Sequence, residues 1–319
     1  MVPISGIVGK YGLYFLILLG DIAMKKLYSN KLIILSLILP GLLVFMFAIL
    51  APICLSIYYG STDYSGMGTA DFIGLKNYQT LIHDKVFWNA LKNSLLLAIG
   101  FICIQHPLAL ITAAVLDKLQ GKAEGFFRCV YFIPNVISVA VIAYLWKFIY
   151  NPDFGLLNNI LKAFGYTGKI NWLSPQNAIW SVLLVLIWHG FGWGMLIYYT
   201  GIKNIDPVLY EAASIDGATQ RQTFWHITLP QMRSVIQINV TMAIISALKQ
   251  METVYLLTAG GPGDSTQFTA NYLYQQAFKA FRYGYGNAIG VVFIVICVVV
   301  TVLLNKFFAE RSETRKVVG

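Results

Sequence analysis

Residues 209–230 read Leu209-Tyr-Glu-Ala-Ala-Ser-Ile-Asp-Gly217-Ala-Thr-Gln-Arg-Gln-Thr-Phe-Trp-His-Ile227-Thr-Leu-Pro230, a polar island between two long apolar stretches. Its local signals predict two short helices joined by a turn. Asp206 is expected to cap the first helix, with Pro207 at the first helical position, where a missing N–H is harmless. Gly217 can adopt a positive φ, so the chain can reverse direction there.

The second helix of this island has its own start and stop signals. Thr219 and Gln222 have the spacing of a capping box, and Pro230 is expected to end or kink the helix. From these residues alone, an ordinary amphipathic helix pair and a specialised docking loop both remain open.

Composition places the rest of the chain in a membrane. The 319 residues are 57% hydrophobic and 12% charged, well below the roughly 25% charged residues of a soluble domain. The net charge of +9 is spread between apolar runs, which does not indicate a nucleic-acid surface. The four cysteines and four histidines show neither disulfide nor metal-ligand spacing. We therefore expect an all-α membrane protein that uses no metal and binds no nucleic acid.

Six apolar stretches are long enough to cross a bilayer, which takes about 20 residues each. They are residues 32–58, 91–115, 127–150, 178–199, 235–257 and 287–308. Most Lys and Arg residues fall in the loops on the N-terminal side, so both termini are expected in the cytoplasm. This orientation also places the 209–230 island in the cytoplasm.

The predicted organisation has three parts. Residues 1–30 form an N-terminal segment at the cytoplasmic membrane surface, residues 31–309 form the transmembrane domain with a cytoplasmic loop at 203–231, and residues 310–319 form a cytoplasmic tail.

A family resemblance resolves the alternatives left open for residues 209–230. The pattern Glu211-Ala-Ala, then Gly217, then Ile227-x-Leu-Pro230 resembles the coupling loop of permease subunits of binding-protein-dependent ABC importers. Further stretches are similar to the oligosaccharide and glycerol-phosphate branch, so that the likeness covers residues 35–305. These stretches are Phe72-Ile-Gly-Leu-Lys-Asn-Tyr78, Tyr131-Phe-Ile-Pro134 and Tyr255-Leu-Leu-Thr-Ala-Gly-Gly-Pro262.

The resemblance implies the fold and a mechanism. It implies the type I importer architecture of six transmembrane helices with a coupling-helix loop that docks into an ATPase subunit. The residues implied for docking are Glu211, Ala212, Ala213, Asp216, Gly217, Ile227, Leu229 and Pro230. The resemblance also implies that the assembled importer moves sugar inward by alternating access.

The resemblance also implies the partners: a second permease, two ATPase subunits, an extracytoplasmic sugar-binding protein, a sugar substrate and the lipid bilayer. The sequence contains no Gly-x4-Gly-Lys-Ser/Thr loop, so ATP and Mg are expected on the partner ATPase and this chain is expected to have no cofactor or enzymatic activity. The expected location is the cell membrane of a bacterium or archaeon.

Aligned with this family, five residues fall on the substrate pathway. Gly190 and Trp193 belong to the fourth span, and Ser246, Ala247 and Gln250 belong to the fifth. Aromatic faces pack on sugar rings, while amides and hydroxyls hydrogen-bond their hydroxyls. Trp193 stands where the family has Tyr, and Ala247 lacks the family's amide.

Lys249 and Glu252 support a second interpretation of the chain. They lie three residues apart in the fifth span, where helix neighbours can form an ion pair. The pair could be structural, or it could relay protons in an ion-coupled secondary transporter, since ionisable groups inside membrane spans are candidates for function.

Overall fold

The computed structural model describes residues 31–119 and 121–316, and in them every regular element is helical, beside one isolated bridge between Thr62 and Phe72. The predicted N-terminal segment, residues 1–30, lies outside the described residues. The chain divides into two compact units, residues 1–58 and 59–319. Each unit is described by itself.

The described part of the first unit is an apolar helix. It comprises α2 (Lys31–Phe45), a π-turn η1 (Met46–Leu50) and the larger part of α3 (Ala51–Gly60). An 18-residue window within the helix Ile33–Gly60 has a mean hydropathy of 2.9, and no residue of this window is buried inside the protein. Side chains that are apolar all round a helix are typical of a membrane span in contact with lipid or with another protein.

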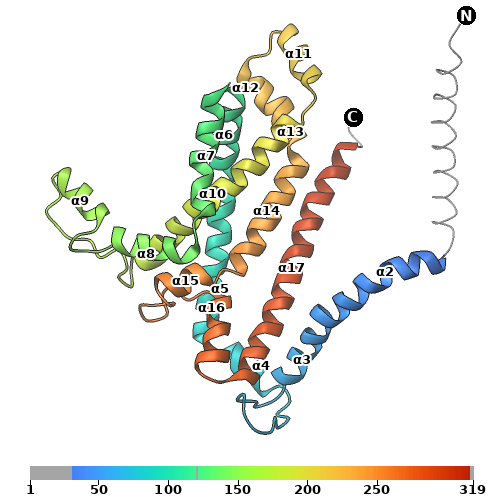
Figure 1. The fold of residues 1–319 in the computed structure, drawn as a ribbon, viewed down its shortest axis with the longest axis vertical. Coiled ribbons are helices and arrows are strands. Elements are labelled where there is room, and N and C mark those ends of the chain that lie inside the picture. The colour runs from blue at the N-terminus through green and yellow to red at the C-terminus, as the bar shows by residue number, and fades with distance from the viewer. Residues whose placement is uncertain (1–30, 120, 317–319) are drawn as a thin grey trace, which may run out of the picture. The chain divides into compact units, whose positions relative to one another are not determined.

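The second unit contains the remaining helices (Figure 1). Their bounds are α4 (Lys76–His83), α5 (Lys85–Gly100), η2 (Phe101–Gln105), α6 (His106–Lys118), α7 (Lys122–Val136), α8 (Val139–Ile149), α9 (Leu156–Ala163), α10 (Ala178–Lys203), α11 (Pro207–Ile215), α12 (Gln220–Thr223), η3 (Phe224–Thr228), α13 (Leu229–Gln231), α14 (Arg233–Leu248), α15 (Glu252–Leu257), α16 (Thr269–Tyr274), η4 (Gln275–Lys279) and α17 (Tyr283–Lys316).

The predicted six spans are not all straight helices. Among the described residues, four helices are by themselves long and apolar enough to cross a membrane: Ile33–Gly60, Lys85–Lys118, Ala178–Lys203 and Tyr283–Leu304. The stretch predicted as one span at 127–150 instead bends by 95° between α7 and α8, because Ile137 and Ser138 adopt extended ψ angles of 136° and 137°. The stretch predicted at 235–257 breaks after Leu248 and resumes at Glu252.

The core of the second unit surrounds α10, which packs against α6 and α7 and also contacts α14. Fully buried side chains from different helices meet there, among them Ile142, Val182, Val185 and Leu248. Gly192 permits the crossing of α7, because a Cβ at this position would overlap the Tyr131 carbonyl oxygen. Helices α11–α13 lie at one end of this bundle, and α4 and α16 lie at the other (Figure 1).

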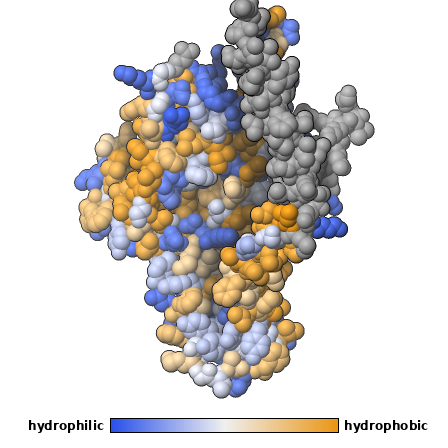
Figure 2. All heavy atoms as spheres, turned by 45° about the vertical axis from the view of Figure 1, so that its right-hand side comes forward, coloured by the Kyte–Doolittle hydropathy of each residue, from blue (hydrophilic) through white to orange (hydrophobic). Residues whose placement is uncertain are grey.

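The outer surface of the helices is apolar. Hydrophobic residues cover much of the face seen in Figure 2. Large apolar side chains are exposed along the spans, including Ile104 at 50%, Ile111 at 56% and Val298 at 56%. Single exposed hydrophobic residues are common on soluble proteins, but continuous apolar faces of this kind indicate contact with lipid or partner helices.

Candidate functional site

The first helix of the 209–230 island forms as its sequence predicts. The Asp206 side chain caps α11 by accepting a hydrogen bond from the Val208 N–H at 3.0 Å, and Pro207 occupies the first helical position. The cap satisfies one of the N–H groups that a helix start leaves without a partner. The short helix therefore has a defined beginning without tertiary support.

The turn and the second helix also follow their local signals. Gly217 has φ +74°, the left-handed conformation that glycine adopts without steric cost. Thr219 and Gln222 form the predicted capping box: the Gln222 N–H donates to Thr219 Oγ1 at 3.3 Å, and the Thr219 N–H donates to Gln222 Oε1 at 2.8 Å. The two helices are thus separated by a well-defined reversal.

Pro230 does not end the second helix. Helix α12 continues through the π-turn η3 into α13. Pro230 is the second residue of α13, a position at which a helix tolerates a residue without an N–H group. The break comes two residues later at Met232, which is fully buried.

Some of the predicted docking residues are exposed on the loop, and the others are buried or partly buried. Glu211, Ala212, Asp216 and Gly217 are exposed. Ala213 is buried, and Ile227, Leu229 and Pro230 are partly buried. The loop presents a surface of mixed character, because the apolar Ile215 beside the two carboxylates is 86% exposed.

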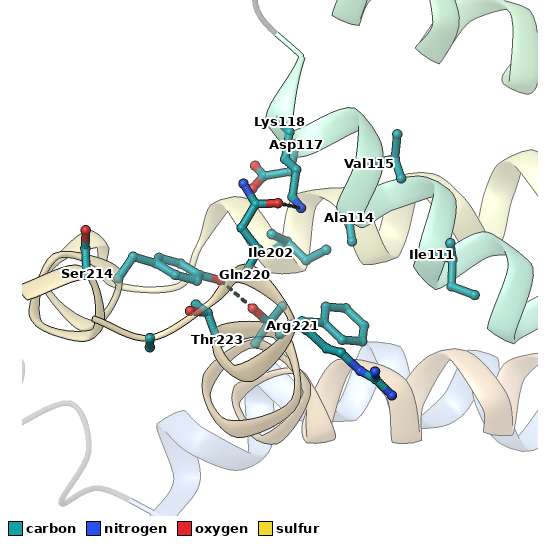
Figure 3. Close-up of a pocket in the computed structure, with 14 residues that line it drawn as sticks. Ile111, Ala114, Val115, Asp117, Lys118, Ile202, Ser214, Gln220, Arg221 and Thr223 are labelled. Atoms are coloured by element: carbon teal, nitrogen blue, oxygen red, sulfur yellow. Dashed lines mark hydrogen bonds between the residues drawn. The ribbon is translucent and has the colours of Figure 1, made fainter. Parts of the chain in front are cut away.

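Side-chain contacts hold this loop against the spans. The Lys118 ammonium donates to Gln220 Oε1 at 2.7 Å, linking the end of α6 to α12, and Lys203 pairs with Asp117 at 2.9 Å. The Tyr210 hydroxyl lies 3.1 Å from Thr228 Oγ1, linking α11 to η3. These contacts border a cavity of about 700 Å³ between the loop and α6 (Figure 3). Residues 209–230 are thus linked directly to α6, and α6 is linked to α10.

A second cavity, of about 250 Å³, lies among the spans. It is lined by four of the five residues predicted for the substrate pathway, namely Gly190, Trp193, Ser246 and Gln250. Ala247, the fifth, is completely buried and does not line it. Trp193 is 56% exposed, so much of its side chain is not covered by the described part of this chain.

The cavity wall also contains His189 and four polar residues that the sequence analysis did not select: Gln105, His106, Asn135 and Asn239. Three of their side-chain amides bond to main-chain carbonyls of α10. Asn135 donates to His189 O at 2.6 Å, Gln105 to Gly190 O at 3.1 Å and Asn239 to Gly194 O at 3.1 Å. In the sequence, each of these three amides is an uncharged polar residue within an apolar stretch. A search for ionisable groups does not find such residues.

The ion pair expected between Lys249 and Glu252 is not formed. In the described part of the chain the side-chain ion pairs are Glu124–Arg128, Asp153–Lys169 and Asp117–Lys203. The helix ends at Leu248 and a new one begins at Glu252, so the two residues are no longer neighbours on one helix face. The structural ion pair considered for these two residues is therefore absent from the described part of the chain.

Known proteins are similar to this chain in sequence and in fold. The family model described as binding-protein-dependent transport system inner membrane component matches residues 105–315. The probable ABC transporter permease protein YurN of Bacillus subtilis (strain 168) is 40% identical over 89% of this chain and 99% of its own length. The probable starch degradation products transport system permease protein AmyD of Thermoanaerobacterium thermosulfurigenes is 31% identical over 90% of this chain and 97% of its own.

A solved structure shows the same fold. The crystal structure of a bacterial ABC transporter involved in the import of the acidic polysaccharide alginate aligns with a TM-score of 0.76 and 23% identity, covering 90% of this chain and 98% of that chain. Together with the matching family model and the permease relatives, this likeness completes the assignment: the chain belongs to the family of binding-protein-dependent transport system inner membrane components.

Proposed function

We propose that this chain is the permease subunit of an ATP-driven importer that carries a sugar into the cell by alternating access. The observation that carries the proposal is the 250 Å³ cavity, which gathers Gly190, Trp193, Ser246 and Gln250 among the spans. An aromatic face beside amides and a hydroxyl suits the apolar faces and hydroxyls of a sugar. A relative that is named for the transport of starch degradation products supports a sugar as the substrate.

The 209–230 loop is proposed to couple transport to ATP hydrolysis. Its exposed Glu211 and Asp216 would pair with basic groups of an ATPase subunit, and the exposed Ile215 would enter an apolar part of the same cleft. Closure of two ATPase subunits would pull the loop and, through Lys118–Gln220 and Asp117–Lys203, move α6 and α10. Alternating exposure of the cavity would follow as a shift between two conformations.

The remaining parts of the assembly follow from this proposal. A second permease would cover the Trp193 side of the cavity, and an extracytoplasmic binding protein would deliver the sugar. ATP and Mg would bind to the ATPase subunits, because this sequence has no phosphate-binding loop of its own. The excess of Lys and Arg in the loops on the N-terminal side favours both termini in the cytoplasm.

Co-purification from detergent extracts tests the coupling proposal. The tagged chain is expected to bring down an ATPase subunit and a second permease, and Glu211→Lys is expected to lose the ATPase because the reversed charge repels the basic groups of the cleft. Asp71→Lys is the matched control, since Asp71 is also exposed but lies on the loop between α3 and α4. Retention of the ATPase by Glu211→Lys, or uptake that persists in ATP-depleted cells, would contradict the proposal.

A further inference from the structure

The wall of the 250 Å³ cavity contains buried polar atoms without hydrogen-bond partners among the described residues. They are Gln105 Oε1, His106 Nε2 and His189 Nε2. Gln105 is 5% exposed and His106 is 4% exposed, and they come from the η2–α6 junction. Buried polar groups in proteins are nearly always hydrogen-bonded, so a cluster of three without partners around one cavity points to a ligand.

The orientation of Gln105 is set by the protein. Its Nε2 donates to Gly190 O at 3.1 Å, which leaves Oε1 as an acceptor on the same wall. Gly190 makes this arrangement possible, because a Cβ there would lie 3.2 Å from both Gln105 Nε2 and Oε1. The glycine thus leaves room for the Gln105 amide beside α10.

His106 has a fixed partner on one ring nitrogen only. Its Nδ1 lies 2.8 Å from the Tyr198 hydroxyl, and the two rings pack edge to face. When the hydroxyl donates to Nδ1, a neutral imidazole carries its proton on Nε2. His106 then offers a donor beside the Gln105 acceptor, and His189 Nε2 adds a third group. A sugar hydroxyl can both accept and donate a hydrogen bond, so this mixture suits a pair of hydroxyls.

The described residues that line the cavity include no Asp, Glu, Lys or Arg. Beside glycines and apolar side chains, the lining consists of side-chain amides, the Ser246 hydroxyl and the imidazoles of His106 and His189. Lys249 follows Leu248 along the chain but does not line the cavity. The carboxylate of an acidic sugar would lie there without a cation, and burying an unpaired charge is costly.

We infer that this cavity selects an uncharged sugar unit, and that Gln105 and His106 determine the selection by hydrogen-bonding its hydroxyls. The inference rests on the proposed function and adds the substrate class. It separates this chain from the fold neighbour that imports the acidic polysaccharide alginate.

Equilibrium dialysis tests this selection on the complete permease and ATPase complex in nanodiscs. The binding protein is left out because it selects sugars by itself. The probes are radiolabelled maltose, lactose and raffinose as neutral sugars, and an alginate trisaccharide as the acidic one. We expect the wild type to bind at least one neutral sugar and to bind the acidic one at least about tenfold more weakly.

Three variants examine the wall. Gln105→Leu and His106→Phe are each expected to weaken neutral-sugar binding about tenfold through loss of one hydrogen bond. The matched control is Thr241→Val, because Thr241 Oγ1 is also buried without a partner but lies outside the cavity. Ser246→Lys adds a cation at an exposed position of the lining and is expected to raise acidic relative to neutral binding.

The outcomes separate this inference from the proposed function. Neutral sugars that bind equally well to Gln105→Leu, His106→Phe and wild type, a wild type that prefers the acidic probe, or no binding of any neutral probe would overturn the inference. An unchanged ratio in Ser246→Lys would also overturn it. Failure of the chain to assemble with an ATPase concerns the proposed function only, and melting temperatures of all variants identify any that are misfolded.

Discussion

At Gly217, the conformation of the backbone matters more than the available space. The residue has φ +74°, and a Cβ built on it would meet no atom within 4 Å. A side chain is therefore not excluded by contact, but L-residues are strained in this conformation by about 1–2 kcal/mol. Asn tolerates it better than other residues with a side chain.

This contrast predicts different effects of two substitutions. Gly217→Val is expected to destabilise the reversal between α11 and α12 by about 1–2 kcal/mol and to lower sugar-stimulated ATPase activity of the assembled importer, because the docking surface loses its shape. Gly217→Asn serves as the control and is expected to retain most activity. Equal ATPase activity of the Val variant and wild type would show that the turn does not depend on glycine.

Asp84 connects three helices of the second unit. Its Oδ1 accepts hydrogen bonds from the Val86 and Phe87 N–H groups at the start of α5, and its Oδ2 accepts from the hydroxyls of Tyr272 in α16 and Tyr285 in α17. Burial by itself would raise the pKa of the Asp84 carboxyl, but these hydrogen bonds to the charged form outweigh it, and the pKa lies below its ordinary value.

The lowered pKa predicts a pH-dependent contribution to stability. Because the folded-state pKa lies below the unfolded value of about 3.9, ionised Asp84 stabilises the fold above that pH, and this contribution is lost as pH falls through the folded-state pKa. Asp84→Asn is expected to lower the free energy of unfolding by about 1 kcal/mol at pH 7. Thermal melting of the detergent-solubilised chain should show the difference from wild type shrinking towards pH 3, while Asp71→Asn shows none at either pH.

Helix packing gives a prediction at the scale of the elements, where two glycines of α10 differ in their surroundings. A Cβ on Gly192 would overlap the Tyr131 carbonyl oxygen and lie 2.9 Å from Phe132 Cα, both in α7. A Cβ on Gly194 would find its nearest neighbour at 3.6 Å, which is an ordinary contact. The same substitution therefore has different consequences two residues apart.

Gly192→Ala is expected to separate α7 from α10 and to destabilise the chain by about 1–3 kcal/mol, because backbone atoms of α7 cannot move aside cheaply. Gly194→Ala is expected to be tolerated. Melting temperatures of the two variants in the same detergent provide the measurement. A Gly192→Ala variant as stable as Gly194→Ala would mean that α7 does not cross α10 this closely.

At the scale of the whole molecule, orientation in the membrane is open to a direct test. Lys122 and Met67 are both exposed; Lys122 is the first residue of α7, and Met67 lies on the loop after α3. In a variant without the four native cysteines, Lys122→Cys is expected to react with a membrane-impermeant maleimide only after the cells are opened, whereas Met67→Cys reacts on intact cells. The reverse labelling would place both termini outside the cytoplasm.

Only part of the helix arrangement could be predicted from the sequence. Hydropathy located the apolar stretches, but it could not show the 95° bend between α7 and α8 or the break at residues 249–251. Apolar composition is the same in a straight helix and a bent pair. In membrane proteins, neighbouring helices satisfy the main-chain groups that such breaks expose, and those neighbours are not apparent from the local sequence.

The sequence by itself determined the local structure of the 209–230 island: the Asp206 cap, the Gly217 reversal and the Thr219–Gln222 capping box. Each depends on residues within a few positions of one another, so local chemistry suffices. The tertiary structure alone decided that Gln105 and His106 share a wall with Gly190 and Trp193. Gln105 and Gly190 lie 85 residues apart, and only the packing of η2 and α6 against α10 brings such distant polar groups around one cavity.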